Sequence, residues 1–355
     1  MSAIFSIFAV LVLVLAAYLG VQTAKLHQVF GVWFPYAAIV LFLAGFVYRV
    51  LKWAKAPVPF RIPTTCGQQK SHDWLPHAKL EAPFTTLQVI GRMALEVLFF
   101  RSLFRNTRAC LREGDKRFVY GPTKWLWLAG LAFHYSFLVI FIRHFKYFAE
   151  PVPGFVKLAQ DLDGFFQIGL PLLYLTDVVI LAAVTYLFLR RVFLPHMRYI
   201  SLASDYFPLM LILGIAVTGV WMRYFDKVDV VGVKELATGL ISLKPTIPAS
   251  VSALFYVHLF LVSVLIAYFP WSKLMHLGGV FLSPTRNLAN NNRAVRHINT
   301  WNYKVKTHPY HEYEEEFHGL MKEAGFPLDK TYEEAEKPEA GDKPKADEKP
   351  AGKEE

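Results

Sequence analysis

Apolar residues gather into six runs along the chain, each long enough to cross a lipid bilayer as a helix. A hydrocarbon core of about 30 Å needs roughly 20 residues of α-helix. Between the runs the sequence turns polar and carries most of its charged residues. The pattern therefore predicts an all-α fold, a polytopic membrane helical bundle with six transmembrane helices. We place them at residues 3–24, 29–48, 125–142, 165–189, 206–222 and about 249–275.

Lysine and arginine are unevenly distributed over the connecting segments, and this predicts an orientation. Residues 49–124 hold 14 basic and 5 acidic residues, whereas 143–164 is balanced at three against three. Because basic loops stay on the cytoplasmic side, we expect 49–124 to be a cytoplasmic loop. Six spans then place both termini in the cytoplasm, with the chain in the cytoplasmic (inner) membrane.

The same pattern divides the chain into four parts. Residues 1–48 form two N-terminal transmembrane helices, and 49–124 form the basic loop. Residues 125–283 form a four-helix core, and 284–355 form a cytoplasmic extension. From about residue 331 the extension is rich in Pro, Lys and Glu and has no large aliphatic residue, so we expect it to be disordered.

Within the basic loop, residues 84–112 show arginines at helical spacing beside an apolar face. We expect an amphipathic helix here, lying on the inner membrane surface. The alternative is a seventh span. It would bring Arg92, Glu96 and Arg101 into lipid at a high free-energy cost.

Composition agrees with a membrane protein and narrows the chemistry. Only 19% of the residues are charged and 54% are hydrophobic, whereas soluble domains carry about 25% charged residues. The net charge of +10 lies in segments that mark topology, so we expect no nucleic-acid partner. Cys66 and Cys110 form no C-x-x-C motif, so the chain itself is expected to hold no zinc ribbon, iron–sulfur cluster or covalently attached haem.

Four of the twelve histidines lie within or at the ends of predicted spans: His134 and His144 on the third, His258 and His276 on the sixth. Ionisable groups at this depth are costly and usually functional. One such histidine alone is equally well explained by a hydrogen bond to a neighbouring helix. Because the third and sixth spans run in opposite directions, we expect His134 to face His276 near the cytoplasm. His144 should face His258 nearer the outside.

Two imidazoles from facing helices, in a bundle rich in Phe, suit an iron porphyrin ligated from both sides. Zinc usually takes three or four ligands, and neither depth supplies them. We therefore expect two haem b groups, with the four histidines as axial ligands of the iron. One difficulty is that His134 and His144 lie roughly 15 Å apart along a straight helix, but His258 and His276 about 27 Å. A bend at Pro270 would absorb part of the difference.

Other charged residues lie at or within the spans. Arg143, beside the second histidine, and Lys273, three residues before the fourth, are candidates for contacts with haem propionates, or else ordinary interfacial cations. Asp177, near the middle of the fourth predicted span, is expected to be protonated or hydrogen-bonded, as a proton relay or as a structural partner of a neighbouring helix. Asp205 is expected to be the N-cap of the fifth span.

Three segments carry a resemblance to a known family. They read AFHYSFLVIFIRHF, FLRRVFLPHMRYISLASDYFPLMLILGIAVTG and FYVHLFLVSVLIAYFPWSKLMHL. With two histidines ten residues apart and two eighteen residues apart, the chain resembles the membrane cytochrome b (gamma) subunit of respiratory nitrate reductase over about residues 33–62 and 124–296. The resemblance implies that His134 with His276 ligates a haem b nearer the cytoplasm, and that His144 with His258 ligates one nearer the outside.

Two features are foreign to the nitrate reductase subunit: the extra N-terminal span and a loop that reads RIPTTCGQQKSHDWLP. Both are similar to the cytochrome b subunit of the membrane complex that serves dissimilatory sulfite reduction, and more distantly to that of the methanogen heterodisulfide reductase. This resemblance implies that menaquinol is oxidised and that electrons pass through two haems to a cytoplasmic iron–sulfur subunit. It also implies further membrane and periplasmic subunits, with quinone and the lipid bilayer as the other partners.

The nitrate reductase family places its quinone near a lysine in the loop after the second histidine. Here that loop reads KYFAEPVPGFVKLAQDLDGFF and offers Lys157, Asp161 and Asp163. We predict Lys157 and Asp161 as the residues of the quinol site. The spacing from His144 differs from that of the family, and for Lys157 an ordinary exposed loop cation is the alternative.

Two other functions remain open at this stage. A proton-coupled transporter would account for Asp177 and the membrane histidines, although no internal repeat or pair of broken helices is visible. A passive membrane anchor for soluble subunits would use the basic loop and the tail as docking surfaces, but it leaves the paired histidines unexplained. The presence of haem separates both from an electron-transfer subunit.

Overall fold

The computed structural model describes residues 1–56, 67–105, 107–112, 114, 116–169, 171–283, 285–296 and 307–329. The chain forms two units, residues 1–302 and 303–355, and helix α13 (Tyr310–Glu323) belongs to the second. Everything below concerns the first unit. The predicted disordered tail from residue 331 lies outside the described residues, as does Cys66 in the basic loop.

Five helices in the described ranges are long and apolar enough to cross a membrane. They match the first, second, third, fifth and sixth predicted spans, so the prediction of a polytopic membrane helical bundle is confirmed. The five comprise α1 (Ser2–Gln22), η1 (Val29–Trp33) with α2 (Phe34–Ala54), α5 (Lys124–His144) with η2 (Phe145–Tyr147), α9 (Ala203–Trp221) with η3 (Met222–Asp226), and α11 (Ala253–Tyr268) with η4 (Phe269–Trp271).

The fourth predicted span, residues 165–189, differs from the structure. Helix α7 runs from Leu175 to Phe193, with Asp177 in its first turn and two arginines in its last, and it is too charged to count among the five. The helix starts late because Gln167 and Gly169 both adopt positive φ, which a right-handed helix excludes. Asp177 therefore lies near one end of α7, not in the middle of a span. A sixth span remains a prediction.

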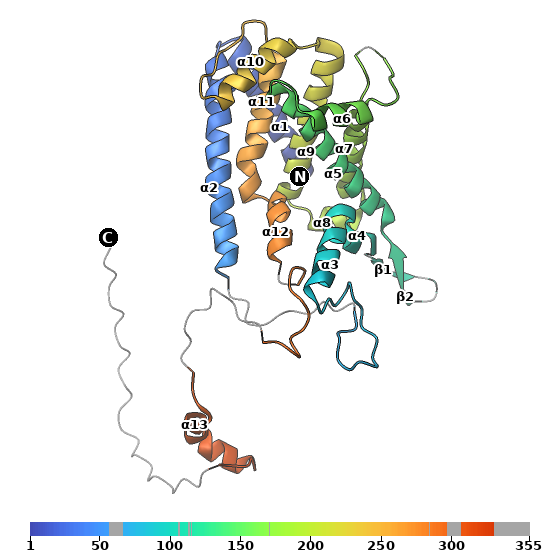
Figure 1. The fold of residues 1–355 in the computed structure, drawn as a ribbon, viewed down its shortest axis with the longest axis vertical. Helices are drawn as coiled ribbons and strands as arrows, with labels where there is room; N and C mark the ends of the chain where they lie inside the picture. Colours follow the sequence, from blue (N-terminus) through green and yellow to red (C-terminus); the bar gives the residue numbers. More distant parts are fainter. Residues whose placement is uncertain are drawn as a thin grey trace, which may run out of the picture. The chain divides into compact units, whose positions relative to one another are not determined.

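The helices pack in a defined spatial order. Helix α7 lies between α5 and α9, α11 lies between α9 and α2, and α1 packs against both α9 and α11 (Figure 1). The apolar core between α1, α9 and α11 includes Val10, Leu211 and Tyr256, all nearly inaccessible. On α2, Gly45 allows a close approach, because a Cβ there would lie only 2.7 Å from the Cβ of Pro270 in η4.

The short elements gather at the two ends of the bundle. Helices α6 (Gly154–Asp163) and α10 (Val230–Ile241) lie at one end. At the other end lie α3 (Thr86–Phe99), α4 (Arg101–Arg105), α8 (Pro195–Ile200) and α12 (His276–Leu282) (Figure 1). The basic loop and the segment 190–205, which carries Arg190, Arg191 and Arg198, thus share one end, as the predicted orientation requires.

The amphipathic helix predicted over residues 84–112 is shorter than expected. Helix α3 ends where Phe100 adopts a left-handed conformation (φ 49, ψ 46), and α4 adds one turn. The chain then forms an antiparallel hairpin of β1 (Thr107–Arg112) and β2 (Arg117–Pro122), in which residue 107 pairs with residue 122. The hairpin was not predicted because Arg108 and Arg112, which lie on β1, are four residues apart. A spacing of four places two residues on the same side of either a helix or a strand.

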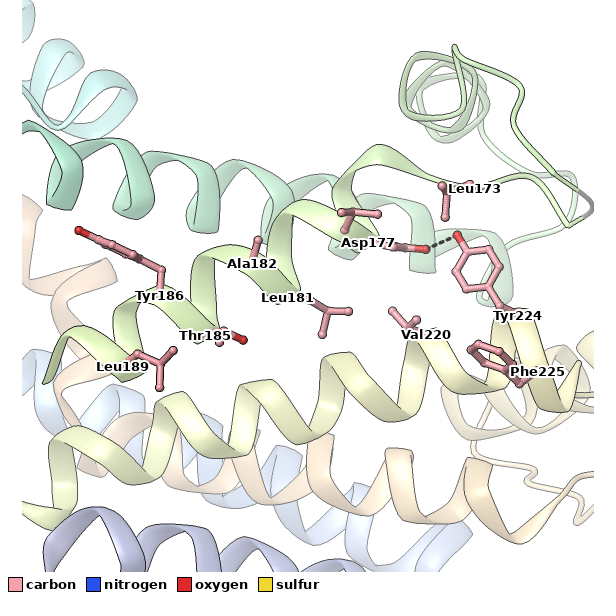
Figure 2. Close-up of a pocket in the computed structure, with 11 residues that line it drawn as sticks. Leu173, Asp177, Leu181, Ala182, Thr185, Tyr186, Leu189, Val220, Tyr224 and Phe225 are labelled. Atoms are coloured by element: carbon pink, nitrogen blue, oxygen red, sulfur yellow. Dashed lines mark hydrogen bonds between the residues drawn. The ribbon is translucent and has the colours of Figure 1, made fainter. Parts of the chain in front are cut away.

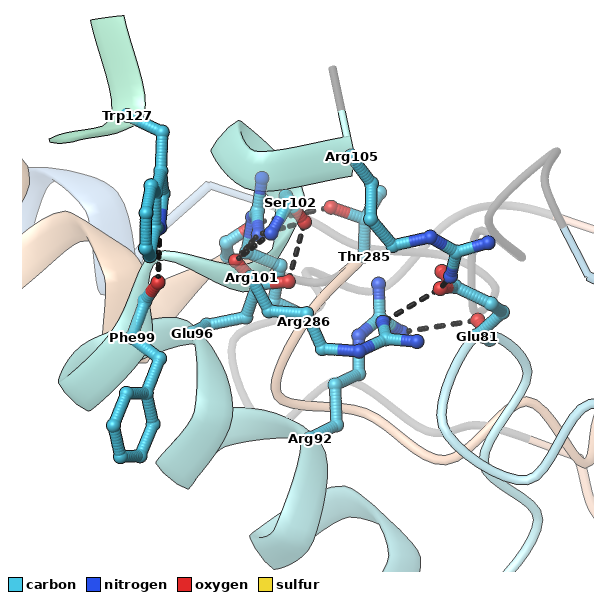
Figure 3. A network of polar contacts seen from close by, with 11 residues as sticks. Glu81, Arg92, Glu96, Phe99, Arg101, Ser102, Arg105, Trp127, Thr285 and Arg286 are labelled. Carbon is cyan, nitrogen blue, oxygen red and sulfur yellow. Dashed lines mark hydrogen bonds and ion pairs between the residues drawn. The ribbon is translucent and has the colours of Figure 1, made fainter. Parts of the chain in front are cut away.

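Helix α3 turns its charged face toward the protein. The carboxylate of Glu96 accepts a hydrogen bond from the backbone N–H of Ser102 (3.2 Å) and lies 2.9 Å from Arg286 (Figure 3). Arg92 and Glu96 are both buried, whereas Leu87 and Ile90 on the same helix are exposed. The helix thus buries its charges and presents apolar side chains outward, as a helix on a membrane surface does. Its place on the inner membrane surface remains a prediction.

Candidate functional site

Two pairs of histidine rings face each other at two levels of the bundle. The ring centroids of His134 and His276 lie 5.9 Å apart, with an angle of 82° between the planes. Those of His144 and His258 lie 6.4 Å apart, with nearly parallel planes (8°). Two imidazoles that bind one metal ion from opposite sides, each at about 2 Å, hold their centroids roughly 6 Å apart. The structure therefore brings together the same two pairs that the topology of the sequence predicted.

A break in the last membrane helix makes both pairs possible. Helix α11 ends at Tyr268, and two short 3-10 turns follow, the first with Pro270 near its start. Between them Ser272 is extended (φ −116, ψ 177), so α12 begins afresh at His276. The separation of 27 Å along one straight helix therefore does not apply, and His276 reaches its partner from a helix of its own.

Backbone hydrogen bonds fix the tautomer of three of the four rings. In each, Nδ1 lies 2.7 or 2.8 Å from a carbonyl oxygen one turn earlier in the chain. Because a carbonyl can only accept, Nδ1 carries the proton and Nε2 of the neutral ring keeps its lone pair. Such a bond on the second nitrogen is the usual support of a metal-binding histidine. The acceptors are the oxygens of Gly130 for His134, Ile140 for His144 and Lys273 for His276.

The fourth ring, His258, finds its partner on another helix. Its Nδ1 lies 2.9 Å from the hydroxyl of Thr218 on α9. That hydroxyl donates to the carbonyl oxygen of Gly214 (2.8 Å), so it accepts from His258. The next residue, Gly219, lets the ring come close, because a Cβ there would lie 3.2 Å from Cε1 of His258. Sequence reasoning missed Thr218, although a hydroxyl inside an apolar helix was a signal for it.

Aromatic rings surround the histidines. Phe100 and Phe133 each meet His134 edge to face, both at 4.9 Å between ring centroids, and Tyr147 lies 5.9 Å from His144. In the part of the chain that the structure describes, no three His, Cys, Asp or Glu side chains are grouped as they would be around a metal ion held by protein alone. Imidazole pairs at this separation, in an aromatic setting, fit the two axial positions of a haem iron.

Arg143, next to His144 in the chain, has two buried carboxylates as partners. Its Nη2 lies 2.5 Å from Oδ1 of Asp177, and its Nε lies 3.1 Å from Oδ2 of Asp163. The hydroxyl of Tyr224 donates a hydrogen bond to the other oxygen of Asp177 (2.8 Å). All three charged residues are buried. Asp177 is thus hydrogen-bonded, and the propionate contact predicted for Arg143 stays a prediction.

Lys273 and Asp205 form the corresponding charged contact near the pair of His134 and His276. The Nζ atom of Lys273 lies 2.5 Å from Oδ1 of Asp205. The second carboxylate oxygen accepts a hydrogen bond from the backbone N–H of Leu202 (3.0 Å). Because α9 begins at Ala203, Asp205 is its third residue, not the N-cap, and the prediction of an N-cap at Asp205 is wrong. The propionate contact of Lys273 remains a prediction.

The residues predicted for the quinol site lie on α6. Lys157 and Asp161 are exposed there, one turn apart, whereas Asp163 at the end of the same helix is buried. Asp163 accepts hydrogen bonds from the backbone N–H and the hydroxyl of Thr176, at 2.8 and 2.6 Å, as well as facing Arg143. Of the three candidates, Asp163 is therefore the one that contacts Arg143, the residue next to His144.

Comparisons with known proteins agree with this arrangement. Residues 117–297 match the family model described as nitrate reductase gamma subunit. A protein of Archaeoglobus fulgidus named "Hdr-like menaquinol oxidoreductase cytochrome b-like subunit" is 45% identical over 280 residues, which cover 77% of this chain and 83% of that protein. A protein of the same name from Archaeoglobus profundus is 41% identical over 274 residues, covering 75% and 81%.

Proposed function

Because the chain belongs to the nitrate reductase gamma subunit family, we propose that it is a di-haem cytochrome b subunit that oxidises menaquinol in a membrane complex. The observation that carries this proposal is the double histidine pair. Each pair offers two imidazoles at a separation that suits one iron atom. Menaquinol as the electron donor is supported by the names of the two archaeal relatives.

Each histidine pair would hold one haem b, and the haem would supply a carrier that accepts and passes on one electron at a time. The protein supplies the ligands and their orientation. His134 with His276 would hold the inner haem, and His144 with His258 the outer one. The Nδ1 hydrogen bonds keep the rings in the tautomer that leaves Nε2 free for iron.

The neighbouring side chains set the surroundings of each pair. Phe100 and Phe133 pack edge to face against the ring of His134 and give it apolar neighbours. Near the outer pair, Arg143 is neutralised by two carboxylates. The outer site is thus close to a cluster of three buried charged residues, whereas the charged contact near the inner site joins Asp205 to an exposed lysine, Lys273.

The order in which electrons would meet the two haems depends on the orientation of the chain. We place both termini in the cytoplasm and count α7 as the sixth span, because the basic loop and the segment 190–205 share one end of the bundle. Electrons would then pass from menaquinol through the outer and inner haems to a cytoplasmic iron–sulfur subunit. A subunit resembling heterodisulfide reductase, acting on a thiol/disulfide carrier, agrees with the "Hdr-like" names of the relatives.

Haem counting tests the proposal. The full chain, purified in mild detergent with its co-purifying subunits, should give a reduced-minus-oxidised spectrum of b-type haem and two haems per chain. Addition of menaquinol should reduce that haem. Intact, folded protein without haem would refute the proposal and leave the anchor or transporter as the function. Co-purification of an iron–sulfur protein tests the partner separately.

A further inference from the structure

A cavity of about 780 Å³ lies between α7 and the end of α9, within the range of volumes that bind small molecules (Figure 2). Asp177 and Tyr224 lie at one end of it, joined by their hydrogen bond. From there the lining follows one face of α7 through Leu181 and Thr185 to Leu189. The cavity is therefore polar at one end and almost wholly apolar along the rest.

The shape of the cavity suits a long, thin ligand. The residues that line it on α7 recur every three or four positions, so they form one stripe along the helix. From Asp177 to Leu189 this stripe is about 18 Å long at 1.5 Å per residue. Val178 and Phe225 in the lining are 51% and 67% exposed, so the cavity opens sideways, where the bilayer would lie. A ligand dissolved in lipid could enter without passing through water.

The polar end is directly connected to the outer histidine pair. Asp177 is bound by Arg143, and Arg143 is the chain neighbour of His144. At the cavity wall, the carboxylate of Asp177 can also accept a hydrogen bond from a hydroxyl group of a ligand. A phosphate headgroup would meet a like charge at this carboxylate, so a phospholipid suits the polar end poorly.

On these grounds we propose that this cavity is the menaquinol site: the naphthoquinol ring lies against Asp177 and Tyr224, and the isoprenoid chain follows α7 toward Leu189. This inference rests on the proposed function. It places the site at α7 and α9, and not at the exposed Lys157 and Asp161 of α6.

Each proton and electron released by quinol oxidation in the cavity has an acceptor. Oxidation of a naphthoquinol to the quinone breaks two O–H bonds and releases two protons and two electrons. The oxidant would be the ferric haem that His144 and His258 would hold; it would take one electron, pass it to the second haem and so be reoxidised before it takes the other. The protons go one at a time to the carboxylate of Asp177, which passes each to water at the near end of α7 before it accepts the next. The first turn of α7 lies close to the α6 end of the bundle, so the route to water is short.

Photochemical labelling of the intact complex tests the location without relying on turnover. A naphthoquinone with a photoreactive side chain should label peptides from residues 175–193 or 220–226, and excess menaquinone should prevent the labelling. Two variants, Leu181→Trp and the smaller change Ala182→Leu, fill the cavity and should lower the labelling at least tenfold. Leu15→Trp, on the exposed face of α1 away from the cavity, is the matched control and should label like the unmodified protein.

The possible results test separately the proposed menaquinol site and the proposed function as a di-haem cytochrome b. The proposed site is overturned if the label is found on α6, or if neither cavity variant reduces the labelling. In that case a normal two-haem spectrum would still support the proposed function. Labelling that excess menaquinone does not displace shows that the cavity holds lipid and also overturns the site. Loss of haem from the unmodified protein, by contrast, defeats the function itself. Because both variants should keep two haems that dithionite reduces, their haem spectrum verifies that they have folded.

Discussion

The hydroxyl of Thr218 on α9 accepts a hydrogen bond from Nδ1 of His258 on α11, at 2.9 Å. The bond is the one Nδ1 contact among the four histidines that joins two helices. It orients the ring and selects its tautomer, and supports of this kind typically change metal affinity by about 10–100-fold. Thr218 is therefore a positioning residue for the outer pair.

We predict that Thr218→Val weakens haem binding at the outer pair by at least about tenfold, because valine has nearly the same shape and no acceptor. Thr218→Ser keeps the hydroxyl and should restore binding. The measurement is haem retained per chain during detergent washing, with the redox potential of each haem recorded. Equal retention by the valine and serine variants would show that the hydrogen bond has no role.

Single histidine variants should remove haems one at a time. His258→Ala takes one ligand from the outer pair and His276→Ala takes one from the inner pair, so each should lower the count from two haems to one. The remaining haem should differ in potential between the two variants, because the two pairs have different surroundings. His196→Ala, on the exposed helix α8, is the control and should keep both. A variant of either ligand that still held two haems would contradict the pairing.

The buried cluster around Arg143 should be important for stability. Arg143→Met leaves Asp163 and Asp177 buried without their cation, and breaking a buried ion pair in this way costs about 3–5 kcal/mol. We expect a clear fall in the thermal unfolding midpoint, measured by far-ultraviolet circular dichroism in detergent. Lys157→Met on the exposed face of α6 is the matched control and should change the midpoint little. Equal midpoints for the two variants would rule out the cluster as a stabilising element.

Phe100 combines a strained backbone with a contact to a proposed ligand. Its φ of 49° lies in the left-handed region, and its ring meets His134 edge to face. Phe100→Ala should lose the ring contact, worth about 0.5–1.5 kcal/mol. Phe100→Gly loses the same contact but relieves the backbone by about 1 kcal/mol. We therefore expect the glycine variant to resist proteolysis between α3 and α4 about fivefold better than the alanine variant. The reverse order would contradict the backbone strain.

The histidine pairs could be predicted because the membrane spans that carry them are visible as continuous apolar runs in the sequence. Spans follow from apolar run length, and consecutive spans run in opposite directions, so the third and sixth are antiparallel and their four histidines pair at two depths in only one way. The predicted distance mismatch came from treating residues 258–276 as one straight helix. A proline was visible in the sequence. The extended conformation of Ser272, which separates α11 from α12, was not.

Other features depend on contacts that sequence spacing does not reveal. Thr218 and His258 are 40 residues apart, and only the packing of α9 on α11 brings them together. The late start of α7 depends on the backbone conformation at Gln167 and Gly169, which changed Asp177 from a mid-span residue to one near a helix end. The hairpin of β1 and β2 was missed because four-residue spacing fits either period.

A seven-residue helix can unravel without its neighbours, and this matters for α12. His276 is its first residue, and the helix packs on α2, with Gly279 against Trp53. Helices this short are marginal on their own in water, so α12 owes its order to that packing. Fraying of α12 would release one ligand of the inner pair while α5 and α11 kept the outer pair intact. On gradual heating, we therefore expect the haem proposed at His134 and His276 to be lost before the haem proposed at His144 and His258.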